Sequence, residues 1–212
     1  MVVSDDADER DLVRRGYDQL SYHYRRDDAE DGQSGLWLAA LRQRLPTPSA
    51  VLDLGCGCGI PIARSLTGAG HDVTGVDISD VQIDRARHLV PGATFLRADA
   101  AEIRFPPASF DAVVCLYVLI HMPLTEQSPL LERIATWLRP GGWLLATVGY
   151  EAWTGTQDNW LGGAASMWWS QADTATYRSW LQQAGLSITH EEHVPEGTSA
   201  HTLIWAQRPP GS

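Results

Sequence analysis

The sequence predicts one α/β domain with a doubly wound, mostly parallel sheet that follows N-terminal helices. Short β-branched runs alternate with helical stretches, which is typical of βαβ units. A length of 212 residues suits one such domain and is short for two. We expect this single domain to span residues 1–208, with a helical cap at 1–45, an insertion at 149–172 and a tail at 209–212.

The helical cap is predicted from apolar residues at helical spacing. Leu12, Val13, Tyr17, Leu20 and Tyr24 mark a first helix, and a second apolar stripe runs from Leu36 to Leu45 and ends at Pro46. After it, five strands are expected at Ala50–Leu54, Asp72–Val76, Thr94–Ala98, Ala112–Leu116 and Trp143–Val148.

The helices between and after these strands have recognisable ends. Ser79 and Gln82 form a capping-box pattern at the start of a helix that runs to about His88. A second helix begins at Thr125 and stops at Pro140-Gly141-Gly142, and a third covers Asp173–Ala184. Two closing strands, Leu186–His193 and Ala200–Gln207, are predicted to form a β-hairpin. Residues 149–172 show no clear periodicity of apolar residues.

The charge of the chain bears on its partners. Sixteen Lys and Arg against 26 Asp and Glu give a net charge of -10, and half of it comes from the first 31 residues. A phosphate backbone would be repelled on average, so nucleic acid is not expected as a partner. No apolar run approaches the ~20 residues that span a bilayer, and no leader pattern opens the chain, so we expect a cytoplasmic protein that does not bind membranes.

Three cysteines, two of them close together at Cys56 and Cys58, do not resemble a disulfide framework and fit a reducing compartment. They offer two soft ligands where a structural zinc takes four. No metal is therefore predicted.

A glycine-rich segment follows the first strand, as Asp53-Leu54-Gly55-Cys56-Gly57-Cys58-Gly59. Alternating glycines let the backbone turn sharply and let a ligand lie against it. A dinucleotide fingerprint needs G-x-G-x-x-G, and here the third glycine comes one position early. The Asp53 charge would oppose a pyrophosphate and suit an ammonium or sulfonium group.

Two further acids end the next two strands. Asp77 lies 22 residues after Gly55, where an acid accepts hydrogen bonds from ribose hydroxyls, and Asp99 can accept from an adenine amino group. Because parallel strands end at one edge of the sheet, the three acids are expected to converge on one crevice.

These residues together resemble the class I S-adenosylmethionine-dependent methyltransferase family. Asp53-x-Gly55-x-Gly57-x-Gly59 is similar to its first motif, Asp77-Ile78 to its second and Asp99-Ala100 to its third, and the likeness runs from about Tyr17 to Thr147. Tyr17-Asp18-x-x-Ser21-x-x-Tyr24 is similar to an N-terminal segment of the small-molecule members, in which a helix folds over the cofactor. Ser21 replaces the usual alanine, and Tyr17 and Tyr24 can equally be the apolar side of an amphipathic helix.

The resemblance implies a Rossmann-like, seven-stranded sheet whose last strand is antiparallel, with S-adenosylmethionine as cofactor and S-adenosylhomocysteine as product. The residues that it implies for the cofactor are Tyr17, Tyr24, Asp53, Gly55, Cys56, Gly57, Asp77, Ile78, Asp99, Ala100 and Leu116.

The acceptor site is predicted from two features. His121, just beyond the fourth strand, lies at the right end of the sheet to act as a general base, or it has a structural role; Glu151 and His201 are further candidates for the base. The insertion at 149–172 is rich in aromatic residues that favour flat or cationic ligands, although each can instead belong to the core. The residues expected to bind substrate are Tyr150, Trp153, Met167, Trp168, Trp169, Tyr177 and His201.

The sequence thus predicts a methyltransferase that acts on a small-molecule metabolite, first at a hydroxyl oxygen and next at nitrogen or sulfur, as a monomer or homodimer. A non-catalytic protein that retains the cofactor site, a nucleic-acid or protein methyltransferase and a nicotinamide oxidoreductase remain as alternatives. Fold alone does not choose among acceptors.

Overall fold

The computed structural model describes residues 5–29, 31–197 and 199–211. Its centre is a seven-stranded sheet in the order β3-β2-β1-β4-β5-β9-β8, in which β9 runs antiparallel to both of its neighbours. The other neighbouring pairs are parallel. The predicted doubly wound sheet with an antiparallel last strand is therefore confirmed. The strands of this sheet are β1 (Ala50–Leu54), β2 (Asp72–Asp77), β3 (Thr94–Arg97), β4 (Phe110–Cys115), β5 (Leu138–Gly149), β8 (Ser187–Glu196) and β9 (Ser199–Gln207).

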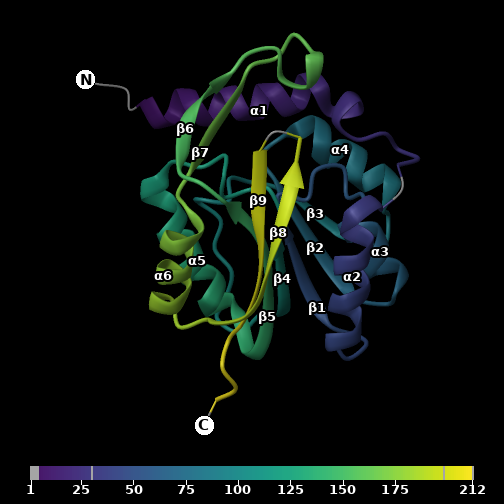
Figure 1. The fold of residues 1–212 in the computed structure, drawn as a ribbon. Helices are drawn as coiled ribbons and strands as arrows, with labels where there is room; N and C mark the ends of the chain where they lie inside the picture. The colour runs from purple at the N-terminus through teal and green to yellow at the C-terminus, as the bar shows by residue number, and fades with distance from the viewer. Residues whose placement is uncertain (1–4, 30, 198, 212) are drawn as a thin grey trace.

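Helices cover both faces of the sheet, and one helix crosses its end (Figure 1). One face carries α5 (Leu124–Trp137) and α6 (Thr174–Gln183), and the other carries α2 (Gly32–Arg44), α3 (Ile62–Gly68) and α4 (Asp80–Leu89). The long N-terminal helix α1 (Asp5–Tyr24) lies across the top of the sheet in this view. This placement brings α1 over the edge where the parallel strands end.

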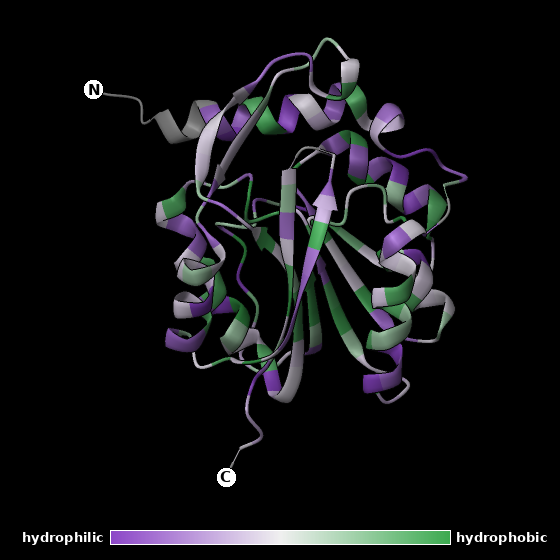
Figure 2. Ribbon diagram, in the orientation of Figure 1, coloured by the Kyte–Doolittle hydropathy of each residue, from purple (hydrophilic) through white to green (hydrophobic). Residues whose placement is uncertain are grey.

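The central strands are apolar because both of their faces are covered (Figure 2). Val51, Leu52 and Leu54 of β1 have no exposed surface, and neither have Val113 and Val114 of β4. Their side chains divide between two buried clusters, one on each face of the sheet. The rigid scaffold that results fixes the positions of the strand ends.

Most predicted boundaries agree with the structure to within two residues. The capping interaction is present, since the Ser79 hydroxyl accepts a hydrogen bond from the Gln82 backbone N–H at 3.0 Å. The largest difference is β5, which begins at Leu138 and not at Trp143, because the chain passes from α5 into the strand without a separate turn.

The insertion at 149–172, in which the sequence shows no clear period, has regular structure. It forms an antiparallel hairpin of β6 (Trp153–Gln157) and β7 (Met167–Gln171) with a short 3₁₀ helix, η1 (Trp160–Gly162), between the strands. The hairpin packs on α1, where Val13 and Leu20 join Trp160, Met167 and Trp168 in a third buried cluster. Sequence periodicity misses it because partners from α1, 140 residues away along the chain, bury its apolar side chains.

Candidate active site

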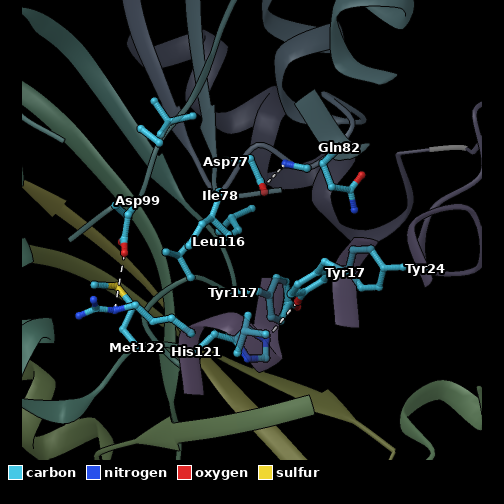
Figure 3. Close-up of a pocket in the computed structure, with 18 residues that line it drawn as sticks. Tyr17, Tyr24, Asp77, Ile78, Gln82, Asp99, Leu116, Tyr117, His121 and Met122 are labelled. Atoms are coloured by element: carbon cyan, nitrogen blue, oxygen red, sulfur yellow. Dashed lines mark hydrogen bonds and ion pairs between the residues drawn. The ribbon is translucent and has the colours of Figure 1, made fainter. Parts of the chain in front are cut away.

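A cleft opens at the carboxyl ends of β1, β2, β3 and β4, beneath α1, and contains about 800 Å³ free of protein atoms, counting the part open to solvent. Open α/β sheets bind ligands at this edge. Figure 3 shows its main side chains. Of the residues predicted to bind the cofactor, the cleft is lined by Tyr17, Tyr24, Gly55, Gly57, Asp77, Ile78, Asp99, Ala100 and Leu116.

The glycine turn after β1 forms the floor of the cleft. Gly55 and Gly57 have φ values of +74° and +52°, which residues with a Cβ rarely adopt. A Cβ on Gly55 would lie 2.2 Å from a methyl carbon of Val118, whereas one on Gly57 would have no atom within 4 Å. The first glycine is therefore needed for packing, and the second leaves open space in which a ligand can approach the backbone.

Asp77 lies at the end of β2 and braces this turn. Its two carboxylate oxygens accept hydrogen bonds from the backbone N–H groups of Gly57 and Ser79, both at 2.9 Å. Burial raises the pKa of Asp77 above its usual value, and the two backbone donors oppose that rise. Each oxygen retains a second lone pair, so the carboxylate can still accept a hydrogen bond from a ligand hydroxyl.

Asp99, after β3, faces a cation from the N-terminal helix (Figure 3). The Nε atom of Arg10 lies 3.6 Å from one Asp99 oxygen, and the guanidinium also pairs with Glu126. The other Asp99 oxygen accepts from the Ala101 backbone N–H at 2.7 Å. These ion pairs help to hold α1 over the cleft.

Asp53 and Cys56 do not line the cleft, contrary to expectation. Both side chains are buried, with 2% and 4% of their surfaces exposed, and the Asp53 carboxyl interacts with the backbone of Ala63 in the first turn of α3. Burial, with a smaller effect from Asp77, raises the pKa of Asp53 to about 8. Asp53 therefore lies beneath the glycine turn, and its burial disfavours the charge that the sequence suggested.

His121 lies at the edge of the cleft in a fixed orientation (Figure 3). Its Nδ1 atom is 2.8 Å from the carbonyl oxygen of Trp168, which accepts only, so Nδ1 carries the proton. Its Nε2 atom is then free to accept from the Tyr17 hydroxyl at 3.1 Å. Burial lowers the pKa of His121 to about 4 and raises that of Tyr17 well above its usual value, which keeps the ring neutral and the phenol protonated.

A second cavity adjoins the cleft and shares Tyr17, Tyr24, Tyr117 and His121 with it. It contains about 820 Å³ free of protein atoms, counting the part open to solvent. Its other lining residues are Arg25, Asp31, Gly32, Gln33, Ser34, Trp37, Trp160, Leu161, Trp169 and Glu196. The Tyr17–His121 pair thus stands at the junction of the two spaces.

Only one residue of the predicted substrate set, Trp169, lines the second cavity. Tyr177, Met167 and Trp168 are buried in the core, and the Tyr177 hydroxyl donates to Gln127 Oε1 at 2.6 Å. Trp153 is about half exposed on β6, outside the described cavities.

The other predicted substrate residues, Tyr150 and His201, and the candidate base Glu151 do not line the cofactor cleft. Tyr150 lines a shallow depression between α6 and β8 with Glu151, away from His121. His201 is buried behind the second cavity, with its Nε2 atom 3.4 Å from Glu196 and its ring against Tyr117. Of the candidates for a base, only His121 lines the cleft.

Several lining residues were missed from the sequence. Arg10 lies three and seven residues before Val13 and Tyr17, so it shares their helix face, and this spacing could have revealed it. Tyr117 has a φ of +61°, a strained conformation for a residue with a Cβ, and its hydroxyl donates to Glu196. No sequence pattern signals either feature of Tyr117.

The fold and the cleft define a nucleoside-binding α/β domain, and the comparisons with known proteins identify its class. Residues 51–142 match a family described as methyltransferase domain. The chain is 41% identical over 98 residues to a 27-O-demethylrifamycin SV methyltransferase of Amycolatopsis mediterranei, covering 43% of this chain and 35% of that protein. It is 36% identical over 104 residues to a ubiquinone biosynthesis O-methyltransferase of Paraburkholderia phymatum, covering 46% and 43% of the two chains.

Solved structures show the same fold across nearly the whole chain. A 1,6-didemethyltoxoflavin-N1-methyltransferase of Burkholderia thailandensis superposes with a TM-score of 0.75 at 19% identity, covering 99% of this chain and 92% of that one. Residues 51–142, the part of the chain that matches the family, together with these relatives and structures, support a class I S-adenosylmethionine-dependent methyltransferase with S-adenosylmethionine as its cofactor. The chain spans less than half the length of the curated relatives named above.

The described residues fit this cofactor. The space above Gly57, which a side chain would fill, and the lone pairs left on Asp77 suit an amino-acid end and a ribose. Ile78, Ala100 and Leu116 supply apolar surface beside Asp99. No helix of the described residues has the length and apolar character to cross a membrane.

Proposed function

We propose that this chain transfers a methyl group from S-adenosylmethionine to a small-molecule metabolite at a hydroxyl oxygen. The observation that carries the proposal is the Tyr17–His121 pair, which lies where the cofactor cleft meets the second cavity. When bound, the cofactor supplies an electrophilic methyl group on a sulfonium. The chain's own residues then have to hold the acceptor in line and remove its proton.

Different residues of the cleft bind different parts of the cofactor in this proposal. In this proposal Asp77 binds the ribose hydroxyls, Asp99 and Ala100 the adenine edge, and Ile78 and Leu116 its faces. Gly55 and Gly57 leave room for the amino-acid end, and Tyr17 and Tyr24 close the cleft from α1. These roles agree with where the side chains lie in the cleft.

His121 is proposed as the general base, acting through its Nε2 atom. The Trp168 carbonyl fixes the proton on Nδ1, so the Nε2 lone pair faces Tyr17 and the junction of the two spaces. Tyr17 can pass its hydroxyl proton to Nε2 while it takes the proton of the acceptor. A pKa of about 4 makes His121 a weak base, but it also keeps the ring unprotonated at neutral pH.

The comparisons support a small-molecule acceptor and leave the acceptor atom open. The two curated relatives named above act on oxygen by their names, a sterol 24-C-methyltransferase of Neurospora crassa is 35% identical over 114 residues, and the toxoflavin enzyme methylates nitrogen. The net charge of -10 disfavours nucleic acid. Nitrogen or sulfur transfer, and cofactor binding without turnover, are the alternatives.

Radioactive S-adenosylmethionine and a panel of hydroxyl, amine and thiol acceptors test the proposal. We expect turnover with a hydroxyl acceptor, and His121→Ala should lower it about 100-fold while S-adenosylhomocysteine still binds. His193→Ala is the matched control, because that residue is exposed and its ring makes an edge-to-face contact with Tyr150 away from the cleft. An unchanged turnover rate in His121→Ala would show that His121 is not the general base. Cofactor binding without turnover on any acceptor would favour a non-catalytic protein.

A further inference from the structure

Two tyrosine hydroxyls stand where the cofactor cleft meets the second cavity, and the direction of each hydrogen bond is fixed. Tyr17 and Tyr117 line the cleft (Figure 3) and also the second cavity. The Tyr17 hydroxyl donates to Nε2 of His121, because the Trp168 carbonyl holds the ring proton on Nδ1. The Tyr117 hydroxyl donates to Oε1 of Glu196, because a carboxylate only accepts. Each tyrosine oxygen therefore offers a ligand its lone pairs and not its proton.

Glu196 stays ionised because of its neighbours. Burial raises the pKa of Glu196, but His201, whose Nε2 atom lies 3.4 Å away, and the Tyr117 hydroxyl together outweigh burial, so the net shift is downward. Burial and the Glu196 carboxylate both raise the pKa of Tyr117. At neutral pH the proton therefore stays on the Tyr117 oxygen and lies toward Glu196.

The backbone of Tyr117 is strained, and three strands hold it in place. Its φ of +61° is one that residues with a Cβ rarely adopt. Its N–H donates to Thr147 Oγ1 of β5 at 2.5 Å, its hydroxyl donates to Glu196 of β8, and its ring makes an edge-to-face contact with His201 of β9 at 5.4 Å between centroids. Such strain persists only where the surroundings impose it, and it concentrates at ligand sites. Here these contacts place the ring in the wall that the two spaces share.

The second cavity favours a flat ring and does not select a ligand by charge alone. Among the described residues, its charged lining consists of Arg25, Asp31 and Glu196, so both signs are present. Flat apolar ligands bind to aromatic walls through ring contacts. The aromatic lining residues are Tyr17, Tyr24, Trp37, Tyr117, Trp160 and Trp169. Shape and the direction of hydrogen bonds are therefore left to select the acceptor.

We infer that Tyr17 and Tyr117 together select an aromatic acceptor that carries a second hydroxyl next to the reacting one. This inference rests on the proposed function, because it names the class of acceptor that is methylated beside the Tyr17–His121 pair. The reacting oxygen takes the methyl group while its proton goes to the Tyr17 oxygen and the Tyr17 proton goes to Nε2 of His121. The second hydroxyl donates to the Tyr117 oxygen and keeps its proton. Tyr117 thus decides which of the two hydroxyls faces the cofactor.

The first arm of the test compares 2,3-dihydroxynaphthalene with 2-naphthol, which lacks the second hydroxyl. Both are titrated by calorimetry into protein saturated with S-adenosylhomocysteine. We expect the wild type to bind the diol about 10-fold more tightly or better, and Tyr117→Phe, which keeps the ring, to remove this preference. Tyr150→Phe is the matched control, because that tyrosine lines the depression between α6 and β8, and it should keep the preference.

The second arm reverses the direction of the Tyr117 hydrogen bond. Glu196→Ala removes the carboxylate that accepts the Tyr117 proton, so the hydroxyl becomes free to donate to a ligand. The probe is 3-methoxy-2-naphthol, whose ether oxygen only accepts. In Glu196→Ala the preference for the diol over this ether should fall about 10-fold. A purely structural role of Glu196 would weaken both compounds equally.

Four results would overturn the inference: a wild type that binds the diol and 2-naphthol alike, a wild type that binds neither, a preference that survives in Tyr117→Phe, or an equal loss of both probes in Glu196→Ala. The proposed function is judged separately, by turnover. Methyl transfer to a hydroxyl acceptor without these preferences keeps the proposed function and refutes the inference. The preferences without transfer to any acceptor refute the proposed function and support the two-tyrosine site.

Discussion

Replacing His121 should change how the stability of the protein depends on pH. An unfolded histidine has a pKa of about 6.5, and burial lowers that of His121 to about 4 in the folded protein. The unfolded chain therefore binds a proton at this histidine more readily than the folded protein does. The contribution of His121 to the free energy of unfolding is present above about pH 6.5 and is lost as the pH falls toward 4. Between about pH 7 and about pH 4.5 the loss amounts to about 2 kcal/mol.

His121→Asn removes the titrating ring, and its amide can still donate to the Trp168 carbonyl. Urea unfolding followed by tryptophan fluorescence, at a series of pH values, gives the free energy of unfolding of both proteins. The wild type should lose about 2 kcal/mol more than the variant over that interval. Other titrating groups, including His71, whose pKa burial also lowers, are common to both and cancel in the difference. Parallel curves would refute a buried, neutral His121.

Three further substitutions, one of them with a matched control, test the site and its supports. Asp77→Ala should weaken S-adenosylhomocysteine binding by about 1 to 3 kcal/mol, and an unchanged affinity in calorimetry would show that the ribose binds elsewhere. Gly57→Ala and its control Gly185→Ala both place a Cβ at a positive φ with no atom within 4 Å, so each should lower the free energy of unfolding by about 1 kcal/mol. Only Gly57→Ala should weaken nucleoside binding. Equal binding by the two variants would contradict the proposal that the ligand occupies the space above Gly57. Tyr177→Phe should lower the free energy of unfolding by about 1 to 2 kcal/mol without changing the KM of an acceptor, and a raised KM would return Tyr177 to the substrate site.

The sequence predicts the ends of β1 and β2 well because both strands are short and largely buried, and because Gly55 follows the first and Asp77 ends the second. Asp77 ends β2 and Asp99 follows the neighbouring parallel strand β3, so both have to lie at one edge of the sheet. Asp53 follows the same pattern but lies under the turn, because the glycine φ values that direct the chain there are permitted by the sequence and not specified by it.

The substrate side is harder to predict because its aromatic residues serve two purposes. Tyr177 and Leu181 are four apart on α6 and are both fully buried, so helical spacing alone could have placed Tyr177 in the core. Trp168 and Trp169 are neighbours on β7, and the alternation of a strand sends one into the α1 cluster and the other into the second cavity. Only the register of the hairpin decides which of the two faces the ligand.

The hairpin and the proposed base form one unit, joined by main-chain hydrogen bonds and by the Trp169 ring, whose centroid lies 4.4 Å from that of the His121 ring. The Trp168 carbonyl accepts from His121, the Ser170 N–H donates to the Ile120 carbonyl at 2.8 Å, and the Ser170 carbonyl accepts from Gln127 at 2.7 Å. Since these contacts use backbone groups of β7, side chains of the hairpin can change without altering the tautomer of His121. Trp169→Phe, which keeps an aromatic ring against His121, should therefore change which acceptor binds while the acid limb of the pH–rate profile stays in place. An acid limb that moves with Trp169→Phe would show that the side chain, and not the strand backbone, sets the state of the base.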